Sequence, residues 1–207
     1  MQFDESHRDV LNEILRWRRD VRHFKTEPVP ADVLNRLACT MNYAPSVGNA
    51  RPWRVVRVLD PGMRQKVREE FARCNLAAAA EYDDATQAEY ARLKLAGLNE
   101  APEHLAIFTL TDPEEGRGLG RRTMPETLRQ STAMAIHTLW LAARAENLGI
   151  GMVSILDPAR MSALFAMPDG WEFSAYLCLG YPAFMDDTPL LHRVGWQENR
   201  QTLWEDR

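Results

Sequence analysis

The sequence predicts a three-layer domain of the α+β or α/β class, in which helices cover both faces of a central sheet. Four short runs have the composition of strands and are apolar on both faces, as expected for strands that helices cover on two sides. Helical segments with apolar stripes lie between these runs. The chain has 207 residues, of which 45% are hydrophobic and 26% charged, which suits one core in a single domain over residues 1–207.

Two helices are expected before the first strand. The first begins near Ser6 and ends just before the arginines of residues 18–22. Its apolar stripe consists of Val10, Leu11, Ile14, Leu15 and Trp17. The second covers residues 29–44, and Pro28 and Pro30 hold its approach extended. Its apolar face consists of Val33, Leu34, Leu37, Ala38 and Met41.

Four strands and two further helical stretches are expected after the loop at residues 44–53. The strands cover residues 53–59, 104–110, 151–156 and 174–182. The longest helix begins near Thr123, where Thr123 and Glu126 have capping-box spacing, runs to about Asn147, and is stopped by Gly149 and Gly151. This helix is apolar around nearly its whole circumference, which favours burial in a subunit interface. The alanine-rich stretch at 71–97 is too weakly apolar for a core and could cover a site.

Composition narrows the class of protein. A net charge of −4 argues against general nucleic-acid binding, which needs a basic face. Three distant cysteines, Cys39, Cys74 and Cys178, give no disulfide framework and fit a reducing cytoplasm. The five histidines are scattered, so no metal site is expected. No apolar run reaches the roughly 20 residues that cross a bilayer, and the charged start is unlike a signal peptide, so a soluble cytoplasmic protein is expected.

The stretch RRDVRHF at residues 18–24 is the first candidate site. Arg18 and Arg22 share a face whether the segment is helical or extended, and Asp20 shares it when extended. A carboxylate about 5 Å from a phosphate would cost roughly 3 kcal/mol at a dielectric near 20. Two interpretations therefore stay open. Asp20 faces another part of an anionic ligand, or the stretch is a surface helix end where Asp20 pairs with a neighbouring arginine.

The loop APSVGNARPW at residues 44–53 is the second candidate. Ser46 and Asn49 can donate to a phosphate or a sugar hydroxyl, and Gly48 lets backbone N–H groups come close to a ligand. Alone, the loop is more simply an ordinary connection. The glycines at 116–120 lack the spacing of a dinucleotide fingerprint, and no helix opens directly after them, so a flexible loop is expected there.

Together these motifs identify a family. WRRDVRHF, APSVGNARPW, YARLKLAGL, MPETLRQSTAMAIHTLWLAARAENLGIGMVSIL, AYLCLGYP and DDTPLLHRVGWQEN resemble the flavin nitroreductase family over practically the whole chain. Within it, the chain is similar to the 5,6-dimethylbenzimidazole synthases of cobalamin (vitamin B12) biosynthesis, the BluB branch. The resemblance implies an α+β, three-layer α-β-α fold with a mainly antiparallel central sheet, in an intertwined homodimer that holds FMN at its interface. It also implies a lid, at Ala77–Leu98 within about 75–100.

The implied reaction consumes the flavin. Reduced FMN, bound as substrate, reacts with O2 and is fragmented to dimethylbenzimidazole and erythrose 4-phosphate, while NAD(P)H acts indirectly through a separate flavin reductase. Ordinary nitroreductases usually have Ser where this chain has Asp20. A carboxylate beside the ribityl chain could serve as a base for the carbon that becomes the benzimidazole C2. The hydroxyl of Ser154 could position O2, and backbone N–H groups at 154–156 are expected to face the flavin N5.

The resemblance thus implies two catalytic residues, Asp20 and Ser154, and no metal ligand. The implied FMN-binding residues are Arg18, Arg19, Asp20, Val21, Arg22, Ser46, Gly48, Asn49, Leu95, Ser154, Leu156 and Arg193. Arg51 departs from the family, which often has Gln there, and its role stays open.

Two other functions stay open. The first is an FMN oxidoreductase that uses NAD(P)H to reduce nitro compounds, flavins or a cobalt corrinoid such as cob(II)yrinic acid a,c-diamide, because the same fold supports that chemistry. The second is a non-catalytic flavin- or corrinoid-binding protein. Asp20 in place of Ser, together with the long lid, favours the synthase. Against a mere binding role, a carboxylate among phosphate-binding arginines would weaken binding unless it had another task.

Overall fold

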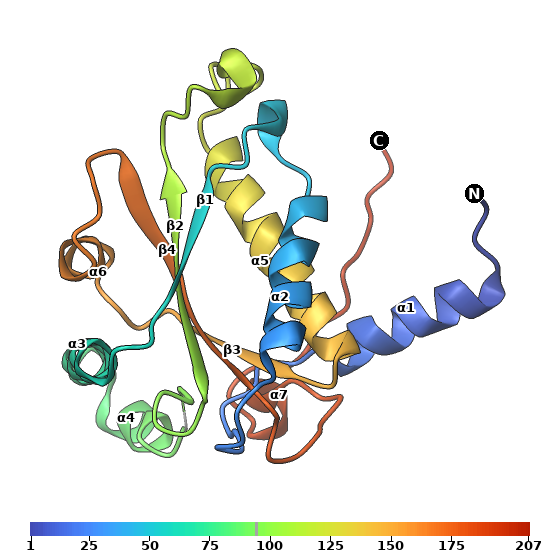
Figure 1. The fold of residues 1–207 in the computed structure, drawn as a ribbon. Coiled ribbons are helices and arrows are strands. Elements are labelled where there is room, and N and C mark those ends of the chain that lie inside the picture. Colours follow the sequence, from blue (N-terminus) through green and yellow to red (C-terminus); the bar gives the residue numbers. More distant parts are fainter. Residues whose placement is uncertain (94) are drawn as a thin grey trace.

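The computed structural model describes residues 1–93 and 95–207, and a four-stranded antiparallel sheet lies at its centre (Figure 1). The strand order is β1-β2-β4-β3. The strands are β1 Trp53–Arg57, β2 Glu103–Leu110, β3 Gly149–Val153 and β4 Trp171–Gly180. Each lies where the sequence predicts a strand, with its ends shifted by up to three residues. The sheet is antiparallel throughout. Of the two predicted classes, α+β and α/β, the structure therefore belongs to α+β.

Helices cover both faces of the sheet, as the apolar strands predict. Helices α2 (Ala31–Thr40) and α5 (Thr127–Ala145) lie on one face, and α3 (Pro61–Ala79), α4 (Asp84–Tyr90) and α6 (Pro158–Leu164) lie on the other (Figure 1). Each face has its own apolar cluster. Leu37, Ile107, Leu139 and Leu177 belong to the first. Val67, Phe108, Met161 and Tyr176 belong to the second.

The long helix α5 begins later and ends differently from its prediction. It starts at Thr127 and not near Thr123, and no side chain caps it at Glu126. The chain before it forms turns after Gly120, whose φ of 77° lies in the left-handed region. At the other end Asn147 takes a φ of 60°. Gly149 and Gly151 are part of β3, so the prediction that they stop the helix is wrong.

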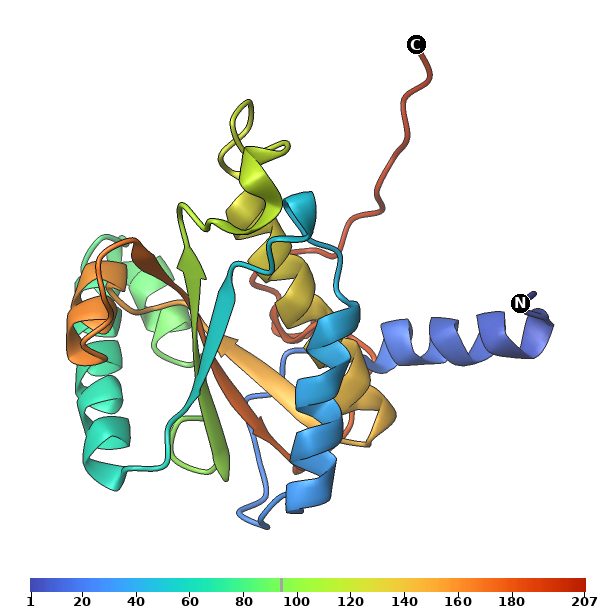
Figure 2. The same cartoon turned by 45° about the horizontal axis from the view of Figure 1, so that its top comes forward.

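Helix α1 (Glu5–Trp17) projects from the body of the molecule (Figures 1 and 2). Its N-cap is Asp4, whose carboxylate accepts a hydrogen bond from the His7 amide. None of its residues is buried, and Val10, Leu11 and Leu15 of the predicted apolar stripe are 60%, 50% and 40% exposed. The stripe is therefore present but packs on little within this chain.

Short helices complete the fold. They are the 3-10 helices η1 (Met41–Tyr43), η2 (Val47–Asn49) and η3 (Glu115–Gly118), and the four-residue helix α7 (Leu190–Arg193). The residues after α7 run in an extended path to the C-terminus, away from the body of the molecule (Figure 2). Among the described residues, no helix is long and apolar enough to cross a membrane.

Candidate active site

The arginine-rich stretch lies along strand β3. After α1 ends at Trp17, the chain becomes extended, and Asp20 forms a parallel bridge to Ile150. The Val21 amide donates to the Ile150 carbonyl at 3.0 Å. A Cβ atom at Gly151 would collide with the Val21 carbonyl. The absence of a side chain at this position of β3 therefore lets the arginine-rich stretch approach the sheet.

Both oxygens of the Asp20 carboxylate accept hydrogen bonds. Arg22 Nε donates to Oδ2 at 2.7 Å, and the Met152 amide donates to Oδ1 at 2.9 Å. The two side chains of this ion pair are mostly buried, with 29% of Asp20 and 14% of Arg22 exposed. The expected pairing of Asp20 with a neighbouring arginine is thus present, and the same contacts fix its carboxylate at β3.

Asp20 and Arg22 lie in the wall of a small pocket of about 50 Å³. Four arginines contribute to the wall, namely Arg19, Arg22, Arg144 and Arg193. Its apolar residues are Trp17, Val21, Pro182, Phe184, Met185 and Leu190. Arg193 pairs with Asp186 and lies over the Phe184 ring, 6.0 Å from its centroid. The wall of the pocket thus combines cationic groups with apolar side chains.

Arg18 lies outside this pocket, although its spacing from Arg22 predicted a shared face. The chain leaves helical geometry at Arg18, where ψ is 101°. Its guanidinium lies 4.9 Å from the centroid of the Trp140 ring, and burial lowers its pKa. Arg18 instead lines a second hollow, together with His137, Trp140, Met152 and Ser174. Asp20 is hydrogen-bonded to the Met152 amide, so the two hollows meet at β3.

Ser154 lies one residue beyond the end of β3 and is exposed. It follows Met152 by two residues, so it lies on the same face of an extended chain, about 7 Å farther along. Leu156 is buried in the core beneath, at 6% exposure. The structure therefore places Asp20 beside β3 and Ser154 just after its end.

The loop with Ser46, Gly48 and Asn49 lies elsewhere. It includes η2, and its Val47 amide donates to Ser131 Oγ at 3.0 Å, near the start of α5. The pocket, in contrast, includes Arg144 in the last turn of α5. The 13 positions from Ser131 to Arg144 correspond to about 20 Å of helix. One chain therefore does not bring the two predicted halves of the site together (Figures 1 and 2).

Within that loop, two residues have roles the sequence did not indicate. Ser46 Oγ accepts a hydrogen bond from the Arg51 amide at 2.7 Å. Arg51 takes a φ of 47°, and Asn49 takes one of 55°. Both values lie in the left-handed region, which is uncommon for residues other than glycine. The Ser46 hydroxyl thus stabilises the conformation of the loop, through a hydrogen bond from the backbone amide of Arg51.

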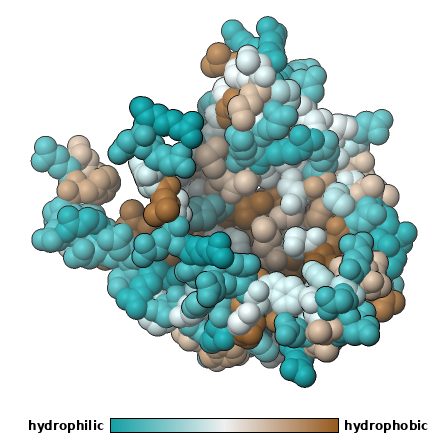
Figure 3. Space-filling model, turned by 180° about the vertical axis from the view of Figure 1, so that it is seen from behind, coloured by the Kyte–Doolittle hydropathy of each residue, from teal (hydrophilic) through white to brown (hydrophobic). Residues whose placement is uncertain are grey.

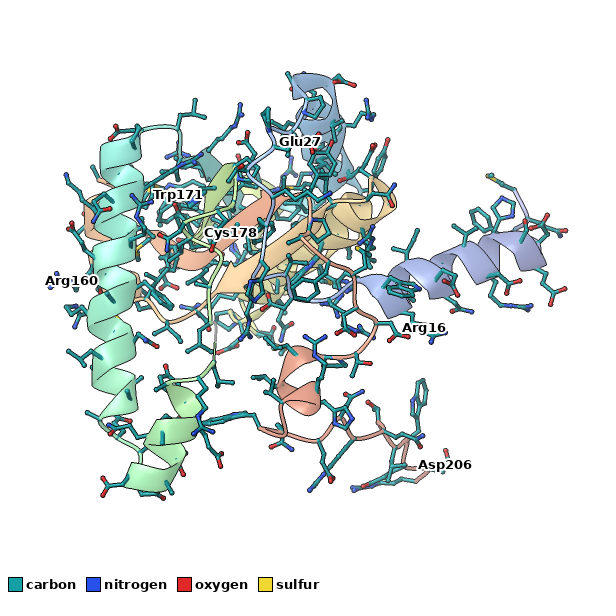
Figure 4. The ribbon with its side chains drawn as sticks, turned by 90° about the horizontal axis from the view of Figure 1, so that it is seen from below. Arg16, Glu27, Arg160, Trp171, Cys178 and Asp206 are labelled. Atoms are coloured by element: carbon teal, nitrogen blue, oxygen red, sulfur yellow. The ribbon has the colours of Figure 1, made fainter. Side chains whose placement is uncertain are left out.

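The predicted lid packs on Phe24, which follows the pocket residue His23, and on helix α3. Gly97 is packed so closely against the Phe24 ring that a Cβ atom would collide with it, and Leu95 is half-buried two residues earlier. In α4, Tyr90 is buried and donates to Asn75 Oδ1 at 2.6 Å. Figure 4 shows α4 and the segment after α7 on the same side of the sheet. Lys94 of this stretch lies outside the described residues.

The arginine that the sequence analysis missed is Arg144. Arg144 lies in α5, a helix whose alanines and leucines predicted a subunit interface. One arginine near the end of such a helix gave no sign of a ligand site. A signal was nevertheless present. Arg144 is four residues after Trp140, and a half-buried arginine in an apolar helix calls for an acceptor or a ligand.

The comparisons with known proteins show which family the chain belongs to. The model of the Nitroreductase family matches residues 15–181. A 5,6-dimethylbenzimidazole synthase from Rhodobacter capsulatus is 58% identical over 207 residues, covering 100% of both chains. One from Rhodospirillum rubrum is 51% identical, covering 96% of this chain and 94% of its own.

Solved structures show the same fold at lower identity. An iodotyrosine deiodinase bound to FMN and 3-iodo-L-tyrosine superposes with a TM-score of 0.73, at 23% identity, covering 95% of this chain and 97% of its own. A nitroreductase with bound FMN from Desulfitobacterium hafniense has a TM-score of 0.63, at 21% identity, covering 85% of this chain and 90% of its own.

Proposed function

We propose that this chain, which belongs to the nitroreductase family, is an oxidoreductase that converts reduced FMN and O2 to 5,6-dimethylbenzimidazole. The observation that carries this proposal is the Asp20 carboxylate, held between Arg22 and the Met152 amide in the wall of an arginine-rich pocket. The full-length likeness to two synthases, at 58% and 51% identity, supports it.

The pocket residues fit reduced FMN as a substrate. Arginines at one side suit a phosphate, which carries a charge of about −1.5 to −2 at neutral pH. Phe184, Met185 and Leu190 offer apolar surface to a ring system. Reduced FMN supplies the electrons that react with O2 and the ring atoms of dimethylbenzimidazole. The second product is erythrose 4-phosphate, which comes from the rest of the ribityl phosphate chain.

Asp20 is the residue that we assign to proton transfer at the ribityl carbon that becomes C2 of the product. Arg22 and the Met152 amide hold its carboxylate in one orientation. A base that is already oriented loses less entropy when it accepts the proton. Ser154, one residue beyond the end of β3, is assigned to positioning O2. The lid residues around Gly97 and Tyr90 exclude water from the pocket, because water there would favour release of hydrogen peroxide and leave the flavin oxidised but not fragmented.

The test is product formation with purified protein. FMN, NAD(P)H, a separate flavin reductase and O2 are supplied, and dimethylbenzimidazole is measured by mass spectrometry. We expect product from the wild type and a loss of at least about 100-fold in Asp20→Asn, the usual contribution of a positioned base. Asp112→Asn, which removes an exposed carboxylate outside the pocket, is the matched control. Steady NAD(P)H consumption without product would favour an FMN reductase of nitro compounds, flavins or a corrinoid.

We also propose that the protein acts as a homodimer in which each site takes its Ser46–Asn49 loop from the second copy. Two observations support this arrangement. The loop and the pocket lie at opposite ends of α5 in one chain. The face of the molecule from which α1 projects is hollowed, with an apolar floor (Figure 3), and the apolar stripe of α1 is exposed.

Subunit complementation tests the shared site. Asp20→Asn and Asn49→Asp are each expected to be inactive, but a mixed dimer would contain one site with neither change. Unfolding and refolding the two variants together should therefore restore about a quarter of the wild-type activity, by random assortment of an oligomer with twofold symmetry. Asp20→Asn mixed with Arg193→Gln is the control, because both changes affect the same half-site. Equal activity in the two mixtures would overturn the arrangement.

The flavin must arrive reduced, so we propose that a separate NAD(P)H-dependent flavin reductase supplies it. The protein is expected in the cytoplasm, where Cys39, Cys74 and Cys178 stay reduced as they are in the structure.

A further inference from the structure

Phe24 packs among three glycines that come from three different segments of the chain. Its ring is almost completely buried, at 6% exposure. A Cβ atom at Gly97 would collide with Cε2 of this ring, one at Gly180 would lie 3.4 Å from Cδ1, and one at Gly151 would lie 3.7 Å from Cζ. Gly97 belongs to the predicted lid, Gly151 to β3 and Gly180 to β4. One ring therefore contacts the lid and the sheet together.

These glycines are needed for space and not for an unusual backbone conformation. None of the three takes a positive φ, so other residues could adopt the same backbone. A Cβ atom at Gly151 would also collide with the Val21 carbonyl, and one at Gly180 would first meet the Pro102 ring. Glycine inside a strand weakens that strand and often marks a close approach. The two glycines of β3 and β4 therefore mark a surface on which residues 21–24 and the segment after the lid pack closely.

Phe24 ends the extended stretch that begins at Asp20, and this stretch is held at both ends. At its start, Asp20 forms the bridge to β3 described above. At its end, Phe24 forms an antiparallel bridge to Pro182, and the Ala183 amide donates to the His23 carbonyl at 2.9 Å. The four residue steps from Asp20 to Phe24 correspond to about 13 Å of extended chain. A shift of the Phe24 ring therefore reaches Asp20 through a short and taut piece of backbone.

The predicted lid contacts the middle of this stretch as well as its end. A Cβ atom at Gly97 would lie 3.4 Å from the Arg22 carbonyl oxygen, and the Arg22 side chain donates to the Asp20 carboxylate. The residues that follow fix this end of the lid in the core, since Leu98 and Ala101 are buried in the same apolar cluster as Phe24. The lid thus packs directly on the two residues that lie between Asp20 and the core.

We propose that Phe24 is a positioning residue for Asp20, and that its contact with Gly97 keeps the Asp20–Arg22 pair against β3 while the lid is in place. The inference rests on the proposed function, since that function assigns proton transfer to Asp20. It couples the exclusion of water to the orientation of the base. When Asp20 is displaced, O2 oxidises reduced FMN to FMN and is itself reduced to hydrogen peroxide, and the flavin is not fragmented. Phe24 therefore sets the fraction of flavin that is converted to dimethylbenzimidazole.

Hydrogen exchange of a single amide tests the positioning role without turnover. The Met152 amide donates to the Asp20 carboxylate, so its exchange rate reports whether that carboxylate stays in place. The rate is measured by NMR in the intact protein, and Asp20→Ala shows the rate of an amide that has lost this acceptor. We expect Phe24→Leu and Gly97→Ala each to speed exchange of the Met152 amide by about 10-fold, as expected for a local opening that has become easier.

Phe108→Leu is the matched control. Phe108 is also a buried ring of the same apolar cluster, but its aromatic contacts are with Phe165 and Phe173. Phe108→Leu should lower the melting temperature at least as much as Phe24→Leu, and it should leave exchange of the Met152 amide unchanged. A general loss of packing is thereby separated from a loss of positioning.

The ratio of products is the second readout. Reduced FMN is mixed with the protein and O2 in a single turnover, and dimethylbenzimidazole and hydrogen peroxide are both measured. Phe24→Leu should lower the ratio of dimethylbenzimidazole to hydrogen peroxide by about 10-fold or more, since a misplacement of about 1 Å can cost about 100-fold in rate. The affinity for oxidised FMN should stay as in the wild type. Phe24→Leu also removes Cε2, the atom that a Cβ at Gly97 would meet, so Gly97→Ala should cost less in the Phe24→Leu background than alone.

The outcomes separate this inference from the proposed function. Unchanged exchange of the Met152 amide in both Phe24→Leu and Gly97→Ala would overturn the role of Phe24 while leaving the synthase intact. A wild-type ratio of dimethylbenzimidazole to hydrogen peroxide in both variants would overturn it as well. If the wild type made no dimethylbenzimidazole, the proposed function would fail, and the exchange rates would still decide whether Phe24 holds Asp20. If Phe24→Leu did not fold, Gly97→Ala decides, because it changes the same contact from the side of the lid.

Discussion

At the scale of single residues, the burial of His104 makes the free energy of unfolding depend on pH. Its side chain is 1% exposed, and Nδ1 lies 2.9 Å from the Tyr176 hydroxyl. Desolvation lowers the pKa of His104 from 6.5 to about 4. Between these values the unfolded chain binds more protons than the folded protein. The free energy of unfolding should therefore fall as the pH drops, by about 2 kcal/mol between pH 7 and pH 5.

Denaturant unfolding at pH 7 and pH 5 checks this prediction, with His104→Gln as the comparison. Glutamine keeps a polar partner for Tyr176 and removes the titration, so its stability should change less over this range. Glu70 does not interfere, because its hydrogen bond from Arg73 lowers its pKa from 4.5 to about 2, and its contribution is lost only below pH 4.5. If the free energy of unfolding changed equally between pH 7 and pH 5 in the variant and the wild type, His104 would not be the cause of the pH dependence.

The sequence predicted several members of the pocket, among them Asp20, Arg22 and Arg193, and the possible pairing of Asp20 with a neighbouring arginine. A catalytic task for Asp20 stays a prediction, and its contact with the Met152 amide of β3 was not predicted. Spacing could not show that Arg18 turns toward Trp140, since that depends on where α1 ends. Arg144 was missed because its acceptors come from Met185 and Asn147, one of them distant in the sequence.

At the scale of elements, aromatic contacts join the lid to the segment that follows α7. Tyr82 lies edge-on to Trp196, with ring centroids 5.8 Å apart, and Tyr90 lies 6.2 Å from the same ring. Trp196 is three residues after Arg193 of the pocket. We expect Trp196→Ala to speed hydrogen exchange in α4 by about 2- to 10-fold, since an aromatic pair contributes roughly 0.5–1.5 kcal/mol.

Trp196→Phe serves as the conservative variant and should restore most of the protection of α4. Trp204→Ala is the matched control, because Trp204 is 94% exposed in the C-terminal segment. If α4 exchanged at the same rate in Trp196→Ala as in the wild type, these aromatic contacts would not hold the lid in place.

Periodicity and composition predicted the elements well and their ends less well. The four strands were found because each contains a short run with β-branched or aromatic residues, although none of the residues of β1 is buried. The start of α5 was misplaced because Thr123 and Glu126 have the spacing of a capping box, whereas Pro125 and the turn after Gly120 determine the path. Gly149 and Gly151 were assigned to a helix end because their real task, close approach by Val21, involves a segment over a hundred residues away.

At the scale of the whole molecule, the single chain leaves two features without a partner. One is the exposed apolar stripe of α1, and the other is the loop with Ser46 and Asn49, which lies about 20 Å along α5 from the arginine pocket. A homodimer that pairs the loop of one copy with the pocket of the other accounts for both. The sequence predicted a subunit interface from the apolar circumference of the helix that became α5, and it predicted an intertwined homodimer through family resemblance. Neither ground shows which surfaces meet between copies.

The measurement that tests the account most directly follows the carbon atoms of the substrate. FMN labelled with ¹³C throughout its ribityl chain is reduced and mixed with the protein and O2 in a single turnover. The account predicts dimethylbenzimidazole with one labelled carbon, at C2, and a labelled erythrose 4-phosphate, both absent with Asp20→Asn. Recovery of intact labelled FMN after its reoxidation, with no labelled benzimidazole, would contradict the central claim that this protein consumes its flavin.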